Sequence, residues 1–215
     1  MLHLNGNKMC AVDIETTGLR PSFHDIIQIA IVPLNDNFGM DQNITPFYTT
    51  LKPVRLENIS EKAMQINGLK IADLLRDALD PEEAAAIFER WYSEKIEGNG
   101  YKKIVPLGYN YAAFDLPFIK EWLGYYSDEP EKSLYDDFFF WQIRDVAMAP
   151  LFCNDIAYMK QITYPFPKHG LKNVCFRMGY RIEGHHDALA DALAAAELYK
   201  RLIDIKLGPA GLDWL

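Results

Sequence analysis

Two acidic residues, Asp13 and Glu15, lie two positions apart at the end of a short apolar segment, Lys8 to Ile14. The segment has the length and composition of a buried strand, in which successive side chains point to opposite faces. Both carboxylates are therefore expected on one face, with Ile14 in the opposite layer. Carboxylates brought together in this way are costly unless cations lie between them, and Mg²⁺ or Mn²⁺ prefers such oxygen ligands.

A strand end with solvated acids is the more frequent meaning of an isolated Asp-x-Glu pair. Here the pair continues into Thr16, Thr17, Gly18 and Leu19, which makes the pattern much more specific. The sequence therefore predicts a metal site at this strand end.

A second polar cluster, Gly108 to Phe118, begins where a predicted strand, Lys103 to Leu107, ends. It continues into a predicted helix, Phe114 to Leu123. Ligands of open α/β sheets bind outside such strand ends, so Asp115 is a candidate metal ligand. A structural alternative exists for each polar residue: the helix dipole favours Asp115 near a helix start, and Asn110 is a common turn residue.

A third cluster lies at the start of the last predicted helix, Asp187 to Ile205. Asp191 falls in the first turns of this helix, and His186 precedes it in the loop, free to turn toward the same site. Asp187 is expected to cap the helix. His185 is expected to be an ordinary loop residue, because adjacent side chains seldom serve one site.

The order of elements predicts how these clusters are held. Strands come first and then alternate with helices, which favours an α/β fold in which helices cover both faces of a mixed sheet. We expect one domain over residues 1–215, with the aromatic-rich segment at about 125–167 as an elaboration. The other predicted strands are Asp25 to Leu34 and Asn43 to Leu51, and the other predicted helices are Ser60 to Ile66 and Pro81 to Ile96.

The composition limits the class of protein. The net charge is −8, from 22 basic and 30 acidic residues, which argues against a protein that coats nucleic acid through a broad basic face. No secretion signal or membrane span is evident, and the three cysteines are typical of reduced, buried thiols. We therefore expect a cytoplasmic or nucleoid-associated protein that is neither secreted nor bound to a membrane.

Together the three clusters resemble the exonuclease motifs of the DEDDh family, which includes ribonuclease T and the proofreading subunit of the bacterial replicative polymerase. The matching motifs, in the order and spacing of that family, are Asp13-x-Glu15, Asn110-x-x-x-Phe114-Asp115 and His186-x-x-x-x-Asp191. The second motif is also similar to that of family B polymerase exonuclease domains. The resemblance covers most of the chain, and motifs that are weak singly are specific jointly.

The resemblance implies a ribonuclease H-like fold with a mixed, mainly five-stranded sheet. It also implies hydrolysis of nucleic acid from the 3′ end with release of nucleoside 5′-monophosphates. Two divalent cations, Mg²⁺ or Mn²⁺, would be held by four acids, with His186 as general base. The implied metal ligands are Asp13, Glu15, Asp115 and Asp191, and the implied contacts to the terminal nucleotide are Thr16, Thr17, Leu19 and Asn110.

Three alternatives concern the substrate and partners. Single-stranded DNA is favoured over RNA because of the similarity to polymerase-associated domains, but an RNA-trimming exoribonuclease fits the same motifs. A non-catalytic nuclease fold that binds nucleic acid or docks on a polymerase is the alternative from another class. The aromatic stretch Tyr135 to Trp141 is either packed on the core, the reading we favour, or a surface for a protein partner or for stacked bases.

Overall fold

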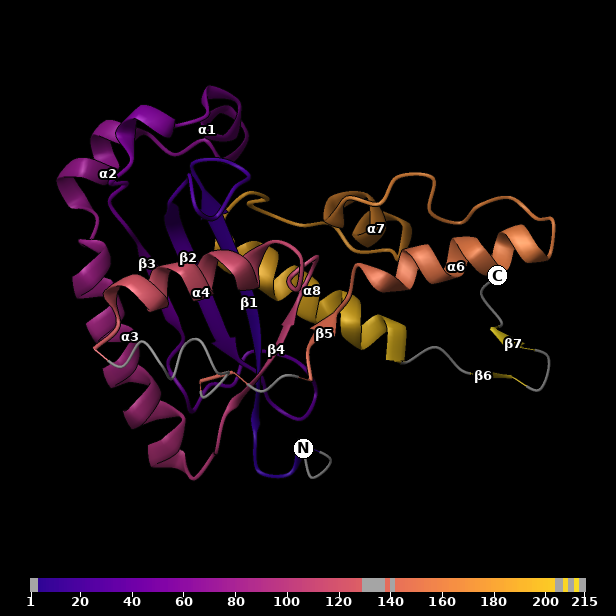
Figure 1. The fold of residues 1–215 in the computed structure, drawn as a ribbon. Helices are drawn as coiled ribbons and strands as arrows, with labels where there is room; N and C mark the ends of the chain where they lie inside the picture. Colours follow the sequence, from indigo (N-terminus) through magenta and orange to yellow (C-terminus); the bar gives the residue numbers. More distant parts are fainter. Residues whose placement is uncertain (1–3, 129–137, 140–141, 204–206, 209–210, 213–215) are drawn as a thin grey trace.

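A mixed five-stranded sheet forms the centre of the computed structural model, which describes residues 4–128, 138–139, 142–203, 207–208 and 211–212 (Figure 1). The strand order is β3-β2-β1-β4-β5. The central strand β1 is antiparallel to β2 and parallel to β4, and β4 is parallel to β5. The strands are β1 (Lys8–Thr16), β2 (Ile26–Pro33), β3 (Phe47–Thr50), β4 (Ile104–Gly108) and β5 (Arg144–Asp145).

Helices cover both faces of this sheet, as the sequence predicts. The helices α3 and α4 pack on one face and α8 on the other (Figure 1). The described helices are α1 (Glu61–Asn67), α2 (Ile71–Asp77), α3 (Pro81–Lys95), α4 (Asp115–Tyr126), α6 (Met148–Met159), α7 (Leu171–Arg177) and α8 (Ala188–Ile203). Two short 3-10 helices, η2 (Leu56–Asn58) and η3 (Glu97–Asn99), and a small hairpin, β6 (Leu207–Gly208) with β7 (Gly211–Leu212), complete the described elements.

Alternation along β1 divides the core into two layers. Cys10, Val12 and Ile14 pack with α3 and α4, whereas Met9 and Ala11 face α8. Several alanines of α8 are buried, so this helix approaches the sheet closely. The alternation that builds the core therefore continues to the end of β1, where it directs two acids toward α8.

An aromatic cluster centred on Phe88 of α3 fills the other layer. Phe88 is fully buried, and its ring lies 5.3 Å from that of Phe138 and 6.1 Å from that of Phe139. Burying such a side chain stabilises the fold by roughly 1.5–3 kcal/mol, and its truncation to alanine costs about 3–5 kcal/mol. Phe138 and Phe139 thus pack on the core, as favoured above; Tyr135, Phe140 and Trp141 lie outside the described residues.

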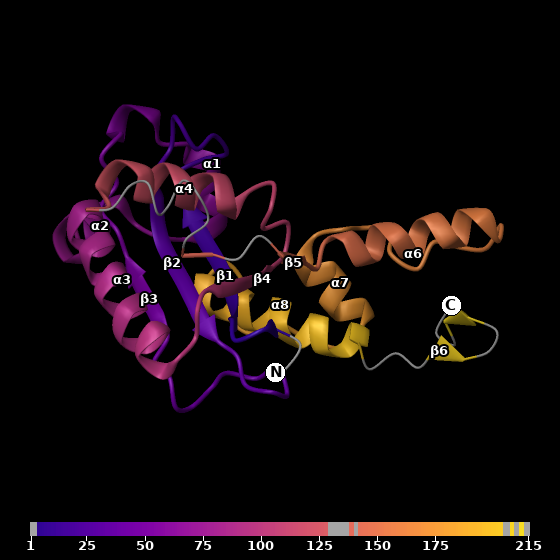
Figure 2. The ribbon, with the colours of Figure 1, turned by 60° about the horizontal axis from the view of Figure 1, so that its bottom comes forward.

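The region at about 125–167 differs most from its prediction. The sequence predicts an aromatic-rich elaboration without a named strand or helix, but the region contains β5 and the twelve-residue helix α6, which extends away from the sheet (Figures 1 and 2). The helical period is hidden because apolar side chains also occupy the outer face of α6. Met148, Phe152, Tyr158 and Met159 are all more than 60% exposed.

Membrane insertion finds no support in the described part of the chain, where no helix is both long and apolar enough to cross a bilayer. The three cysteines are free and buried, as expected. Burial raises the pKa of the Cys153 thiol to about 11, so this thiol is protonated near neutral pH.

Candidate active site

Three carboxylates meet where β1 ends against the start of α8. Oxygen atoms of Asp13, Glu15 and Asp191 all lie within 4.8 Å of one another. Asp13 and Glu15 are two residues apart on β1, so the pleat places both on the face covered by α8. Asp191 comes from the first turns of α8 and is 5% exposed. The structure thus brings together three of the four predicted metal ligands in one tight cluster.

Asp115, the fourth predicted ligand, approaches the same strand end from α4. It is the first residue of that helix and is 3% exposed. Its Oδ1 atom accepts a hydrogen bond of 3.1 Å from the backbone N–H of Ile14, the residue between the two acids of β1. Asp115 is therefore held beside the tight cluster, although it is not one of its three members.

Burial and repulsion from neighbouring acids disfavour the charged forms of Asp13 and Glu15. The pKa of Asp13 is raised well above its usual value by burial first, and then by the charges of Asp115 and Asp191. Burial followed by repulsion from Asp191 and Asp187 raises the pKa of Glu15 to about 7. Protons or cations must therefore offset the repulsion, and a cluster of hard carboxylate oxygens suits divalent cations.

The two histidines before α8 both lie at this cluster. The His186 backbone N–H donates to Asp191 Oδ2 at 3.2 Å, and His185 Nδ1 lies 2.8 Å from Asp191 Oδ1. The two imidazole rings are 3.8 Å apart between centroids. His186 precedes the helix in the loop, as predicted. The prediction that His185 is an ordinary loop residue is wrong, because the left-handed backbone of His186 (φ 72°) folds the loop back and brings both rings to one site.

A polar network that the motifs did not reveal fixes the start of α8 to the sheet. Asp187 caps the helix as predicted, since its Oδ1 accepts from the Ala190 N–H at 3.1 Å. Its Oδ2 accepts from Tyr48 on β3 at 2.7 Å and from Gln28 on β2 at 3.2 Å. Gln28 Oε1 in turn accepts from the Ala188 N–H at 2.9 Å. This network sets the position of the loop that carries both histidines.

The threonines after β1 stabilise their own turn. Thr16 Oγ1 donates to the carbonyl of Gly18 at 2.6 Å, and Thr17 Oγ1 accepts from the Asp25 N–H at 2.9 Å. Both threonines are buried, whereas the side chain of Leu19 is 79% exposed. Of these three predicted substrate contacts, only Leu19 presents its side chain to solvent.

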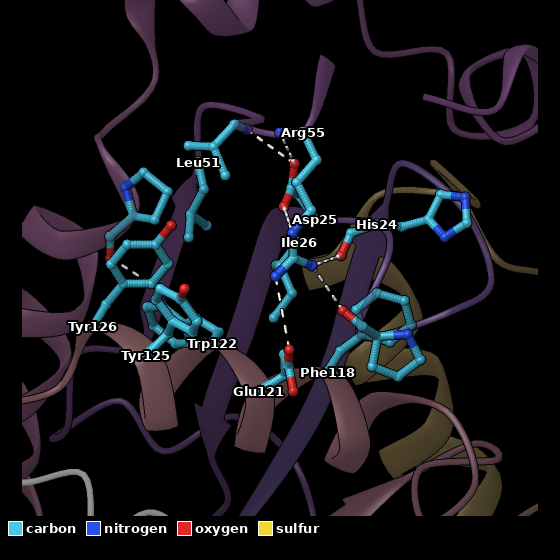
Figure 3. Close-up of a pocket in the computed structure, with 13 residues that line it drawn as sticks. His24, Asp25, Ile26, Leu51, Arg55, Phe118, Glu121, Trp122, Tyr125 and Tyr126 are labelled. Atoms are coloured by element: carbon cyan, nitrogen blue, oxygen red, sulfur yellow. Dashed lines mark hydrogen bonds and ion pairs between the residues drawn. The ribbon is translucent and has the colours of Figure 1, made fainter. Parts of the chain in front are cut away.

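Behind this turn lies a small pocket of about 30 Å³, shown in Figure 3. Asp25 Oδ2 accepts from the backbone N–H groups of Val54 and Arg55 at 2.9 and 2.7 Å. The Arg55 guanidinium donates to the carbonyls of Pro21 and His24 (Figure 3). Asp25 and Arg55 therefore brace the turn that follows β1.

Asn110, the remaining predicted substrate contact, is held by a residue that no motif contains. It adopts a left-handed conformation (φ 61°), and its N–H donates to Asp145 Oδ1 at 2.9 Å. The N–H groups of Ala112 and Ala147 donate to the same carboxylate at 3.1 Å each. Asp145 on β5 thus links the loop before Asp115 to the start of α6.

The sequence matches a known protein family over most of its length. Residues 10–199 match the sequence model of the RNase T exonuclease family. The chain is 29% identical over 204 residues to the 3′–5′ DNA exonuclease Cap18 of Escherichia coli, and the match covers 90% of each protein. It is 29% identical over 109 residues to ribonuclease T of Buchnera aphidicola, covering 50% of each.

Longer proteins are matched over a part of their length. The match to the PolC-type DNA polymerase III of Ureaplasma parvum is 25% identical over 190 residues and covers 87% of this chain but 11% of the polymerase. The fold superimposes on Escherichia coli exonuclease I in complex with a dT13 oligonucleotide with a TM-score of 0.71 at 18% identity. That match covers 92% of this chain and 41% of exonuclease I, and it confirms a ribonuclease H-like fold. The chain therefore belongs to the RNase T exonuclease family, within the DEDDh group that its three motifs resemble.

Proposed function

We propose that this chain is a metal-dependent 3′–5′ exonuclease that acts on single-stranded DNA and releases nucleoside 5′-monophosphates. The observation that carries the proposal is the meeting of Asp13, Glu15 and Asp191 within 4.8 Å, with Asp115 held against the same strand end. Family membership supports the reaction, since each of the three motifs contributes to this one site.

Four acids would hold two divalent cations, Mg²⁺ or Mn²⁺: Asp13, Glu15, Asp115 and Asp191. When bound, such ions lower the pKa of a coordinated water and stabilise the negative charge on the leaving 3′ oxygen. The raised pKa values of Asp13 and Glu15 describe the cost of the site without cations, which is the expected property of a cation-binding site. Asp115 is oriented for the same task by the Ile14 N–H.

His186 would accept the proton of the attacking water. Burial, followed by the neighbouring His185, lowers the pKa of the His186 imidazole. A neutral imidazole can accept a proton at neutral pH, as a general base must. His185 contacts Asp191 directly, so we assign it to the support of that ligand.

The terminal nucleotide would lie against the turn that follows β1 and the loop around Asn110. Leu19, with its exposed side chain, supplies an apolar contact to the base. Thr16 and Thr17 would contribute by holding this turn in shape, because their hydroxyls and the backbone N–H and carbonyl of Thr17 are engaged within the protein. Asn110 is exposed in the loop that leads to Asp115.

DNA is favoured over RNA by two observations. The second motif resembles polymerase-associated exonuclease domains, and a relative that matches over 90% of both proteins is named a DNA exonuclease. An RNA-trimming activity is the second candidate, favoured by the partial match to ribonuclease T. The PolC-type relatives suggest a polymerase as a protein partner.

A direct assay tests the proposal. The purified chain is incubated with 5′-labelled single-stranded DNA, duplex DNA or RNA in Mg²⁺ or Mn²⁺, with Asp13→Asn as the control. A ladder that shortens from the 3′ end, fastest on single-stranded DNA and absent in the control, is the expected result. If RNA were shortened faster than DNA, the RNA-trimming activity would become the favoured function. No degradation with either ion would favour a non-catalytic binding or docking module.

A further inference from the structure

Positive charge is concentrated in one segment of this acidic protein. Residues 156–182 contain five of the 22 basic residues and none of the 30 acidic residues. The five are Lys160, Lys168, Lys172, Arg177 and Arg181. Such a segment attracts a polyanion locally, although the net charge of the chain is −8.

The middle of this segment lies beside the helix that carries Asp191. Lys172 is the second residue of α7, and buried side chains of α7 pack with those of α8. The hydroxyl of Tyr109, the neighbour of Asn110, donates to the carbonyl of His169. From His169 the path follows the loop of residues 160–170, which joins α7 to the end of α6, and α6 extends away from the sheet (Figures 1 and 2).

Two open pockets follow this path and share Pro167. The first, of about 350 Å³, is lined by Lys168, Asn173, Phe176 and Arg177 in addition to Pro167. Asn173, Phe176 and Arg177 are spaced i, i+3 and i+4, so they share one face of α7. The second pocket, of about 510 Å³, is lined on α6 and in the loop after it by residues that include Tyr158 and Tyr164.

Hydrogen bonds tie the loop between the two pockets to α6. Asn154 of α6 donates to the Phe166 carbonyl at 2.7 Å and accepts from the Phe166 N–H at 3.1 Å. Its amide also lies 2.9 Å from His169 Nε2. Phe166 is 2% exposed and anchors the loop between the two pockets.

Exposed aromatic rings line both pockets, and cations line the first. Phe176, Tyr164 and Tyr158 are 60%, 49% and 69% exposed, and Lys168 and Arg177 line the same pocket as Phe176. Aromatic faces stack on bases of any sequence, and cations neutralise the phosphates of a single strand. Among the described residues, the second pocket is lined by Asp155 and by no lysine or arginine, so the positive charge is strongest in the first pocket.

We propose that Lys168, Arg177, Phe176, Tyr164 and Tyr158 form a track that binds the upstream nucleotides of a single-stranded DNA. The proposal rests on the proposed function, which places the 3′ end of the same strand at the carboxylate cluster. The track makes affinity and repeated cleavage depend on the length of the strand, whereas a very short oligonucleotide reaches only the cluster.

The test compares Lys168→Gln/Arg177→Gln with the matched control Arg90→Gln/Lys102→Gln, which removes the same charge. Arg90 is exposed on α3, and Lys102 is exposed just before β4, at the strand end opposite the acids. Binding of fluorescent dT15 and dT3 is measured by anisotropy in Ca²⁺ over a range of salt, and hydrolysis is measured in Mn²⁺. A second variant, Phe176→Ala, tests the stacking contact without a change of charge.

The track variant should bind dT15 about tenfold more weakly than wild type, and its salt dependence should fall by about 1.4 in log–log slope for two phosphate contacts. Phe176→Ala should also weaken dT15 binding by about tenfold. The control should match wild type, and dT3 hydrolysis should be equal in all four proteins. Unchanged dT15 binding in both track variants would overturn the track, while hydrolysis by wild type would leave the proposed function intact. Loss of dT15 binding in a protein that hydrolyses neither oligonucleotide would support the track and refute the nuclease.

Discussion

The carboxylate cluster and the α6–α7 region (residues 148–177) differ in almost every physical property. Asp13, Glu15 and Asp191 are packed where a strand meets a helix, and their charges repel one another. The α6–α7 region is basic, carries exposed aromatic side chains, and extends from the edge of the sheet (Figure 2). The contrast suggests a division of labour, in which the rigid centre performs hydrolysis and the exposed region selects and retains the strand.

Asp13→Asn should have the largest effect and should separate the two regions most clearly. The substitution keeps the shape of the side chain but removes a charge on which cation binding depends, so turnover in Mg²⁺ or Mn²⁺ should be abolished. Cation binding, measured by calorimetry, should weaken in parallel, while dT15 binding without divalent cations is retained. Substantial turnover by this variant, or loss of metal-free dT15 binding, would mean that the centre and the track do not divide the work as proposed.

Alanine substitutions of His185 and His186 should show which of the two imidazoles contributes more to turnover. Loss of a general base lowers the rate by about 10²–10⁴-fold, which is the expected effect of His186→Ala on kcat. His185→Ala removes a partner of Asp191 and should cost about tenfold, mostly through weaker cation affinity. Single-turnover rates at saturating Mn²⁺ distinguish these outcomes. A larger loss for His185→Ala would transfer the role of base to His185.

Asp145→Ala should have an intermediate effect, because this carboxylate joins the centre to the α6–α7 region. It accepts hydrogen bonds from backbone N–H groups of the loop before Asp115 and from the Ala147 N–H at the start of α6. Its loss should lower kcat/KM by about 10–100-fold, the usual effect of a residue that orients the ligands of a metal site. The decline should be greater for dT15 than for dT3. Equal losses would show that Asp145 supports the centre alone.

The centre could be predicted from the sequence because its geometry follows from local periods. The two-residue repeat of β1 places Asp13 and Glu15 on one face, and the position of Asp191 near a helix start directs it inward. Gln28 was also detectable, since it is the one polar side chain in the apolar strand β2. Its partners Tyr48 and Asp187 are distant in the chain, so the network itself required tertiary structure.

The α6–α7 region and the position of His185 could not be predicted in the same way. The outer face of α6 is apolar, which hides the helical period, and Asp145 lies in a segment without a motif. His185 reaches Asp191 through a left-handed backbone at His186, a conformation that the sequence does not specify for a non-glycine residue. The charge asymmetry of residues 156–182 was visible in the sequence, but its place beside the active site was not.

The smallest expected effect concerns stability and belongs to the centre alone. The pKa of Glu15 is raised from 4.5 to about 7 in the folded protein, so Glu15 binds a proton more readily when folded than when unfolded. The stability that the folded protein gains from this proton is fully present below about pH 4.5 and is lost as the pH rises through 7. Without cations, Tm should therefore be higher at pH 6 than at pH 8, by about 2–4 °C for each kcal/mol gained.

Mn²⁺ added at pH 8 should restore the lost Tm, because binding to the folded state alone stabilises it. Glu15→Gln should raise the metal-free Tm at pH 8 and flatten its dependence on pH between 6 and 8, since the neutral amide no longer repels Asp191 and Asp187. Glu83→Gln, on the exposed side of α3, is the matched control and should follow wild type. The track variants should also keep the wild-type pH dependence. A metal-free Tm that rises from pH 6 to pH 8 would contradict the electrostatic account of the centre.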